Sequence, residues 1–348
     1  MDTNFWNNLK RPIIGLAPMD GVTDVAFRQM VVRHSTPSVL ITEFVNVEGL
    51  ARGAVKMLHA FRYEENERPI VAQVFGVEVE SFYKATVMLL NMGFDGVDIN
   101  MGCPVNKVAR KGSGAGLIQT PEKAKEIIRA CKRAAKDFAE GISMEEAGVH
   151  EAIIAEVNRM YPKGFERRLL PISVKTRIGY DKPVTEEWIK CLIEEDPANI
   201  TLHGRTLKQL YLGEANWKEI AKGGKLCKEA GISFLGNGDV KNYKDAQKKC
   251  KKYKIDGVLV GRATFGDPWF FSDYVPTFDD RVEAALEHVD LFEKLLGDKL
   301  FFAHMKKHLG WYLKGFDGAK ELRVNLMAAE TFDQAREIIT VFRNSLDN

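Results

Sequence analysis

The chain has 348 residues, 45% of them hydrophobic and 28% charged, which is enough to bury a sizeable core in one large domain with a smaller one attached. Lys and Arg number 50 against 48 Asp and Glu, so a nucleic-acid surface would need local clustering of charge. The five scattered cysteines form no CxxC pair and no apolar run approaches the ~18 residues of a membrane span, so we expect a cytoplasmic protein with no membrane contact, disulfide framework or bound metal.

Eight short apolar segments, each followed by a helical pattern, predict parallel strands. They are PIIGLAP (12–18), VLITEF (39–44), PIVAQVFG (69–76), GVDINMG (96–102), PISVKTR (171–177), NITLHGR (199–205), SFLGNGD (233–239) and GVLVGR (257–262). Helical patterns between them include 120–136, 185–195 and 241–252. Near-continuous apolar strands covered by helices indicate a parallel sheet, and eight such units match the size of an α/β protein of the (β/α)8 TIM-barrel class. A doubly wound sheet would need fewer units, and no GxGxxG follows the first strand.

Two regions depart from this alternation. The segment 137–170 is longer than a strand-to-helix connection needs, and its apolar spacing predicts a helical insertion, of which a surface elaboration is the simplest interpretation. After Trp269 the strands stop, and Pro276 marks a plausible linker before a pattern that is helical to the end. We therefore expect a barrel domain over 1–277 and a small all-helical domain over 278–348.

Polar residues or glycines follow every predicted strand, at the end where a barrel places its active site. Those after the last two strands are Asn237, Gly238, Asp239, Gly261 and Arg262. The glycines would let backbone N–H groups approach phosphate oxygens, and the arginine could add a bidentate contact. Each glycine taken singly could equally make only a tight turn. Together these residues favour a cofactor that carries phosphate.

Lys175 ends an apolar strand and has three possible roles. It could form a Schiff base as in an aldolase, lie beside a flavin or phosphate, or reach to the surface. The nearby strand ends carry Gln73, Asn100 and His203, and neutral groups of this kind suit a flat heterocycle better than an aldolase site. We therefore prefer a contact between Lys175 and a cofactor.

Seven motifs resemble, in the same order, those of the flavin-dependent, bacterial-type tRNA-dihydrouridine synthase family. They are APMDGVTDVAFR, AQVFG, DINMGCPVNKVARKGSGAGLI, VKTRIG, HGRT, GNGDV and DGVLVGRA. They span the chain from Ala17 to about Trp269, and the cysteine stretch is the most specific of them. The segment KKHLGWYLKGFDGAKELR (306–323) is similar to the family's C-terminal helical domain.

The resemblance implies an FMN enzyme that reduces the C5–C6 double bond of specific uridines in tRNA to 5,6-dihydrouridine, with NADPH as reductant. The family's flavin contacts fall on Pro18, Met19, Asp20, Gln73, Lys175, His203, Asn237, Gly238, Asp239, Gly261 and Arg262. Its proton donor falls on Cys103, and Asn100 is expected to face the uracil ring. We expect Arg177 and Arg205 to contact the substrate as well. The expected partners are tRNA and NADPH, with no protein partner required.

The implied reaction explains why a thiol stands at position 103. After hydride reaches C6 of uracil, C5 needs a proton, and a thiol with a pKa of about 8.5 remains protonated at neutral pH, whereas a carboxylate is ionised. Cysteine is usually a small buried residue, but the glycines and cations beside Cys103 argue against that here. In the same loop Lys107, Arg110 and Lys111 can meet the tRNA backbone. We expect the other four cysteines to lie in the core.

The helical tail offers a second candidate contact with tRNA. The target uridine must leave the folded tRNA, at a cost of a few kcal/mol. Between 299 and 323, six Lys and Arg are interleaved with aromatic residues, while only two residues are acidic. We expect most of the aromatics to pack inward, as in an ordinary amphipathic helix. Those expected to face the RNA are Lys306, Lys307, His308 and Lys314.

Two rival functions remain. The nearer is an FMN-dependent TIM-barrel reductase of a free pyrimidine or another small enone-like substrate, similar to a dihydroorotate dehydrogenase. The basic strip in the helical tail argues against it, because a small-molecule reductase does not need one. The other rival is a tRNA-binding protein without catalysis, against which the joint presence of Cys103, Lys175 and His203 argues.

Overall fold

The computed structural model describes residues 4–104, 112–162, 164–316 and 318–346. Eight parallel strands follow one another in chain order around a closed barrel, and β8 pairs with β1. The strands are β1 (Ile13–Leu16), β2 (Leu40–Asn46), β3 (Ile70–Phe75), β4 (Gly96–Met101), β5 (Ile172–Arg177), β6 (Asn199–His203), β7 (Ser233–Asn237) and β8 (Gly257–Val260). The prediction of a (β/α)8 barrel is confirmed.

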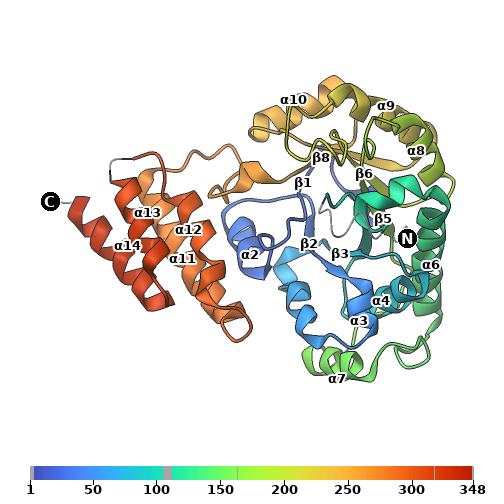
Figure 1. Ribbon diagram of the computed structural model, residues 1–348, viewed down its shortest axis with the longest axis horizontal. Helices are drawn as coiled ribbons and strands as arrows, with labels where there is room; N and C mark the ends of the chain where they lie inside the picture. The colour runs from blue at the N-terminus through green and yellow to red at the C-terminus, as the bar shows by residue number, and fades with distance from the viewer. Residues whose placement is uncertain (1–3, 105–111, 163, 317, 347–348) are drawn as a thin grey trace.

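Helices surround the barrel on its outer face (Figure 1). They are α2 (Val25–His34), α3 (Val47–Ala51), α4 (Val79–Asn91), α6 (Pro121–Glu140), α8 (Thr185–Ile193), α9 (Trp217–Glu229) and α10 (Tyr243–Tyr253). Short 3-10 helices are η1 (Val55–Phe61), η2 (Glu65–Glu67), η3 (Gly114–Gln119), η4 (Arg262–Thr264) and η5 (Phe302–His304). Helix α6 continues beyond the predicted end at 136 because the next residues keep its pattern until Gly141, whose left-handed φ of 109° ends it.

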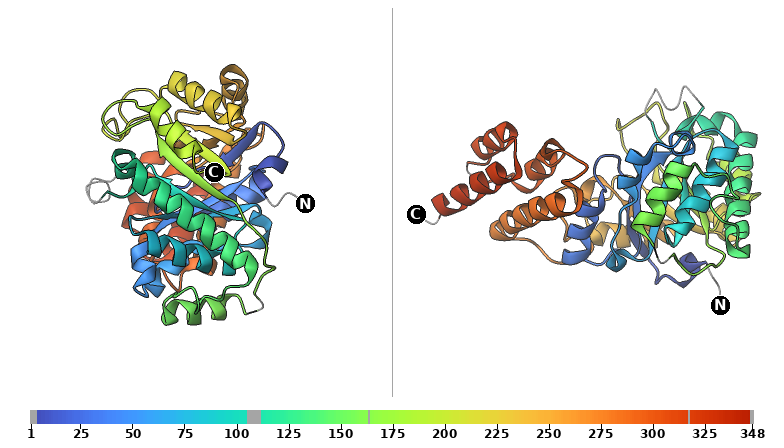
Figure 2. Two further views of the ribbon diagram at one scale, coloured as in Figure 1. Left: turned by 90° about the vertical axis from the view of Figure 1, so that its right-hand side faces the viewer. Right: turned by 90° about the horizontal axis from the view of Figure 1, so that it is seen from below.

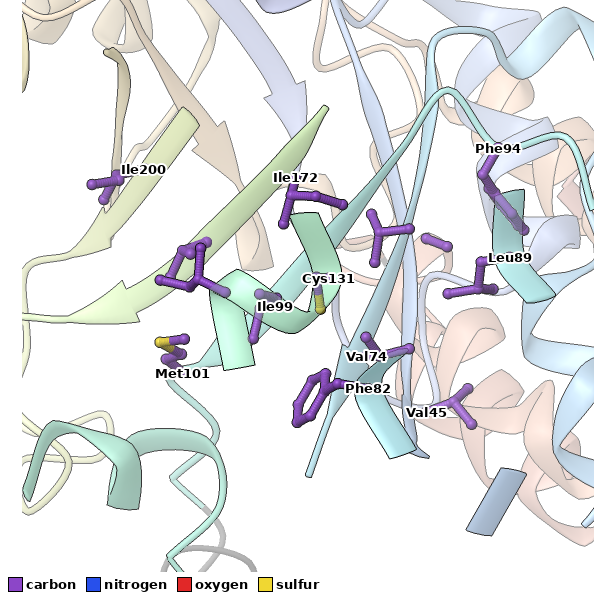
Figure 3. Close-up of a cluster of buried hydrophobic side chains, with 14 of the residues drawn as sticks. Val45, Val74, Phe82, Leu89, Phe94, Ile99, Met101, Cys131, Ile172 and Ile200 are labelled. Atoms are coloured by element: carbon purple, nitrogen blue, oxygen red, sulfur yellow. The ribbon is translucent and has the colours of Figure 1, made fainter. Parts of the chain in front are cut away.

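The strands are apolar on both faces because each face is buried. Between the barrel and its helices, side chains such as Ile99 on β4 pack with Phe82 on α4 and Cys131 on α6 (Figure 3). Inside the barrel, Ile41, Val71, Leu235 and Leu259 form a second cluster with Trp6. Trp6 belongs to α1 (Phe5–Asn8) and is 1% exposed. This filled interior leaves the chemistry to the carboxyl ends of the strands.

In the described part of the segment 137–170, the end of α6 is followed by a further helix, α7 (Glu151–Met160). Ile153, Ile154 and Val157 bury its inner face. The ring of Tyr161, just beyond α7, stacks on Tyr63 with the centroids 5.8 Å apart. The helix therefore packs on the outside of the barrel, below α3 and α4 in Figure 1.

Helices follow the barrel, as predicted, and extend from one side of it (Figure 2). They are α11 (Phe278–Leu296), α12 (Lys306–Tyr312), α13 (Ala319–Ala328) and α14 (Phe332–Leu346). Thr277 caps α11 by accepting the Asp280 N–H, in a capping box. No helix in the described part of the chain is both long and apolar enough to cross a lipid bilayer.

Helix α2 joins the barrel to these helices. Its residues Val25, Ala26 and Met30 belong to the same buried cluster as residues of α11 and α12. Polar contacts surround this core: Arg62 donates to the Leu295 carbonyl at 2.5 Å and pairs with Asp298 at 3.0 Å. The two parts are therefore held in one arrangement by a common core and its polar rim.

Candidate active site

A cavity of about 1020 Å³ opens at the carboxyl ends of the strands. Its wall includes thirteen residues that sequence analysis had selected: Pro18, Met19, Asp20, Asn100, Cys103, Lys175, Arg177, His203, Asn237, Gly238, Asp239, Gly261 and Arg262. They come from six different strands or the loops after them. The barrel thus brings together residues spread over more than 240 positions of the chain.

A chain of hydrogen bonds across β3, β4 and β5 holds the loop that carries Cys103. Asp98 accepts from Ser173 Oγ and from Gln73 Nε2, each at 2.6 Å. Gln73 Oε1 in turn accepts from Asn100 Nδ2 at 2.8 Å. Asn100 Oδ1 accepts the backbone N–H of Cys103 at 2.8 Å. Burial raises the pKa of Asp98 to about 6, and the bonds from Ser173 and Gln73 oppose that rise.

Two cations and a neutral histidine share the wall next to this chain. Burial, and then the neighbouring Arg177, lower the pKa of Lys175 to about 8. Burial also lowers the pKa of Arg177 to about 10, and its Nε donates to the Gly102 carbonyl at 2.6 Å. Burial and the charges of Arg177 and Lys175 hold the pKa of His203 well below its usual range. His203 is therefore a neutral hydrogen-bonding group at neutral pH.

The loops after β7 and β8 make a narrow, polar cradle. A Cβ on Gly238 would lie 2.7 Å from the Ala215 Cβ, so only glycine fits there, at a φ of 123°. Asp239 accepts from Arg205 at 2.6 Å and from Arg262 at 3.1 Å. Burial opposes its ionisation, yet the Ala215 N–H and Arg205 lower the pKa of Asp239 below its usual value. Arg262 keeps a side chain that is 52% exposed and can still meet an anion.

These features fit a flavin mononucleotide. Gly238 and the cation of Arg262 offer a close backbone approach and a charge for a phosphate group. Lys175, His203 and Asn100 present one cation and two neutral polar groups, which suits a flat ring with carbonyl and imine atoms. The volume of the cavity is at the upper end of the range for cofactor sites.

The loop after β1 forms part of the cavity wall and contacts the C-terminal helices. Gly21 N–H donates to Glu43 Oε1 at 2.5 Å, and the Gly21 carbonyl accepts from Lys307 of α12. Burial and the proximity of Asp24 raise the pKa of Glu43, and burial likewise raises the pKa of Asp24. The loop after β1 is therefore held by Glu43, which is buried beside Asp24, and by Lys307 of α12.

Two predicted contact residues do not reach the surface of the cavity. Gln73 is fully buried below Asn100, and its amide is used by Asp98 and Asn100. Arg205 is 2% exposed and lies behind Asp239, where it donates to the Gly213 carbonyl at 2.5 Å. Both residues hold side chains that line the cavity: Gln73 bonds to Asn100, and Arg205 to Asp239.

The helical tail is arranged differently from the prediction. His308 is 1% exposed, and its ring lies 5.6 Å from Phe27 and 4.8 Å from His288, so the expectation that it faces RNA is wrong. Lys306 donates to the Met327 carbonyl at 2.6 Å, and Lys307 reaches the loop after β1. Lys107, Arg110 and Lys111 lie outside the described residues.

Three aromatic residues of the cavity wall were not predicted. Phe44 turns toward the cavity because the register of β2 against β3 shifts between Ile41 and Phe44. Tyr211 stands at the rim with the guanidinium of Arg262 5.2 Å from its ring. Phe265 stacks on Trp311 of α12 at 3.9 Å. The aromatic residues that follow β8 in the sequence could have indicated Phe265. No feature of the sequence indicates the irregularity in β2 that turns Phe44 toward the cavity.

Cys131, Cys227 and Cys250 are buried, as expected, and Cys191 is partly exposed. Cys103 is also buried, contrary to expectation, at 3% exposure, but it lines the cavity. In the ranges that the structure describes, no three His, Cys, Asp or Glu side chains are grouped so that they could hold a metal ion.

The model of the family described as dihydrouridine synthase (Dus) matches residues 15–139 and 142–346. A probable tRNA-dihydrouridine synthase of Staphylococcus epidermidis is 34% identical over 355 residues, covering 100% of this chain and 98% of that protein. Probable tRNA-dihydrouridine synthase 2 of Bacillus subtilis is 33% identical over 356 residues, with 100% and 99% covered. A crystal structure of DHODH from Eimeria tenella with ferulenol covers 81% of this chain and 82% of that one at 11% identity, with a TM-score of 0.47.

Proposed function

The chain belongs to the dihydrouridine synthase family, and we propose that it reduces the C5–C6 double bond of specific uridines in tRNA to 5,6-dihydrouridine, using FMN and NADPH. The observation that carries this proposal is the cavity that joins Cys103 to Lys175, His203 and the cradle at Gly238. On this proposal the protein acts in the cytoplasm, where its substrate and reductant are found, and needs no protein partner.

The chain's own residues would bind and orient the cofactor. The cradle of Gly238 and Gly261, with Arg262, would hold its phosphate, while Pro18, Met19 and Asp20 line the cavity beside the β8 loop. Lys175 and His203 would contact the ring system as a cation and a neutral donor or acceptor. When bound and reduced by NADPH, FMN supplies the hydride that the pyrimidine accepts at C6.

Cys103 would complete the reduction by giving its proton to C5 of the uracil ring. Its backbone N–H is fixed by Asn100, so the thiol is carried by a held segment of the cavity wall. Arg177, which lines the same cavity, would stabilise negative charge on a uracil carbonyl oxygen as hydride adds. These roles need the uridine to enter the cavity, which a folded tRNA permits only if the base is extruded.

The direct test uses the purified protein and an unmodified tRNA transcript. We expect a flavin absorbance spectrum that NADPH bleaches, and dihydrouridine in the tRNA, measured by mass spectrometry of its nucleosides. A protein that purifies without flavin would contradict the proposal. A flavoprotein that leaves tRNA unchanged but reduces a free pyrimidine or an enone would support the rival function instead.

A further inference from the structure

Helix α10 presents a basic outer face. The segment 241–254 contains seven lysines and one acidic residue, Asp245. Ala246 and Cys250 are buried and mark the inner face of the helix. At 3.6 residues per turn, the opposite face is formed by Lys244, Lys248, Lys251 and Lys252, and each of the four is exposed. We refer to these four residues as the lysine stripe.

The lysine stripe differs from the charged surface of α6 in how few of its charges are paired. Helix α6 carries six Lys and Arg residues, and each has a carboxylate oxygen within 3.9 Å. In the stripe, Lys244 has only Asp273 at 3.9 Å, and no ion pair is found for the other three lysines among the described residues. Asp245 is already used by Lys249 at 3.2 Å. Like charges at this spacing repel one another, so an uncompensated row is costly unless an anion covers it.

The lysine stripe starts at the rim of the candidate active site. Val240 and Lys241 line the cavity, and Asn242 caps α10 directly after them. From the rim the helix carries the lysines about 15 Å along the outside of the barrel. In Figure 1, α10 lies between α9 and the C-terminal helices. A polyanion that spans the cavity and the C-terminal helices therefore has the stripe within its reach.

The C-terminal helices alone offer little positive surface. Residues 278–348 contain ten Lys and Arg against thirteen Asp and Glu. Lys306 and Lys307 are engaged with backbone carbonyls, and His308 is buried. Because affinity for a nucleic acid depends on neutralising several phosphates, the barrel must contribute cations of its own.

We propose that the lysine stripe binds backbone phosphates of the same tRNA whose uridine enters the cavity, an inference that rests on the function proposed above. A row of lysines provides point charges that suit phosphates without reading a base sequence. The exposed residues of α10 are Lys and Gln alone, so the helix lacks the apolar centre that a protein interface needs. RNA is therefore the partner that this surface fits.

The test compares two variants that each lose four positive charges. The stripe variant replaces Lys244, Lys248, Lys251 and Lys252 by Gln. The control replaces Lys123, Arg129, Lys132 and Lys136 of α6 by Gln, on the side of the barrel away from the C-terminal helices (Figure 1). Gln is a good helix former, so both helices should remain folded, which circular dichroism checks. Binding of an unmodified tRNA transcript is measured over a series of salt concentrations, together with the KM and kcat for dihydrouridine formation.

For the stripe variant we expect a Kd for tRNA raised about tenfold or more at roughly 0.15 M salt, and a plot of log affinity against log salt that is shallower by about 2 to 3. KM should rise with kcat, flavin content and reduction by NADPH unchanged, and the control should bind like the unaltered chain. A double variant, Lys248→Gln with Lys251→Gln, should show about half of the change in slope and serves if the fourfold variant misfolds.

Several results would overturn this inference. An unchanged Kd and slope in the stripe variant would mean that the stripe does not contact tRNA. Equal weakening of tRNA binding by both variants would mean that only the net charge of the protein matters. Either result, with normal dihydrouridine formation by the unaltered chain, would leave the proposed function intact. An unaltered chain that neither binds nor modifies tRNA would overturn both proposals.

Discussion

One side-chain oxygen of Asn100 holds the loop that carries the proposed acid. It accepts the N–H groups of Gly102 and Cys103 at 2.9 and 2.8 Å, while the amide nitrogen donates to Gln73. A proton donor is effective only within hydrogen-bond reach of the atom that it protonates, so the placement of the thiol matters as much as its acidity. We therefore regard Asn100 as a positioning residue for Cys103 as well as part of the cavity wall.

At the residue scale, Glu43 gives a prediction about pH. Burial and Asp24 raise the pKa of Glu43, so the folded chain keeps a proton that the unfolded chain loses, and stability falls as pH rises. Glu43→Gln retains an oxygen for the Gly21 N–H but cannot ionise. Relative to the unaltered chain, the variant should gain stability from about pH 5 to about pH 8, by at most roughly 1.4 kcal/mol per pH unit.

Thermal unfolding of both proteins across this pH range provides the measurement. The same buffers would be used without tRNA or NADPH, so that ligand binding does not shift the transition. A difference in unfolding free energy that stays constant with pH would mean that Glu43 is ionised in the folded chain.

At the scale of the elements, the turn after β7 gives a prediction about the cofactor. Gly238 and Gly231 both have positive φ, 123° and 74°, so replacing either by Ala costs roughly 1–2 kcal/mol of backbone strain. Only at Gly238 would the new Cβ also press on neighbours, 2.7 Å from Ala215 and 3.1 Å from His203. Gly238→Ala should therefore lose most of the bound flavin, whereas Gly231→Ala should keep it.

Flavin absorbance per protein chain measures this difference. Gly231→Ala is the matched control because nothing lies within 4 Å of its added Cβ. Equal flavin content in the two variants would place the cofactor away from the turn after β7.

The sequence predicts the elements well because a parallel barrel buries both faces of each strand. All eight predicted strands are present, since their apolar runs have no other stable place in the fold. The prediction that His308 faces RNA was wrong because α12 has only seven residues. So short a pattern does not show which face of the helix is buried, and His308 could not be distinguished from the lysines beside it. Phe44 was missed because it depends on a bulge in β2.

The candidate site was predictable to the level of the strand end. A polar residue at the carboxyl end of a barrel strand points to the active-site end, which placed Lys175, His203 and Cys103 correctly at the cavity. The same rule does not tell how deep a side chain lies. Gln73 and Arg205 lie in the layer behind the cavity wall, held by Asp98 and Asp239, and only the packed structure reveals that.

At the scale of the whole molecule, α2 belongs to two cores at once. Val31 packs toward the barrel, and Val25, Ala26 and Met30 pack with α11 and α12, while Phe27 contacts both sides. Removing the C-terminal helices would therefore expose the apolar face of α2 that they cover. Exposed apolar patches of this kind promote aggregation in a soluble protein.

A chain that ends at residue 277 should consequently be less soluble and unfold at a lower temperature than the full chain. Soluble yield and the unfolding midpoint are the measurements. The same truncated chain with Ala26→Glu and Met30→Lys should recover solubility, because the two substitutions place charged side chains on the face of α2 that the truncation exposes. A truncated barrel that is as soluble and as stable as the full chain would show that the common core contributes nothing.

The most direct test of the account is a comparison of Cys103→Ala with Cys191→Ala. Both variants remove one thiol, but only Cys103 lines the cavity. We predict that Cys103→Ala binds flavin and is reduced by NADPH normally, yet forms dihydrouridine in tRNA about 100-fold more slowly or worse, while Cys191→Ala matches the unaltered chain. Dihydrouridine formation at the normal rate by Cys103→Ala would contradict the account.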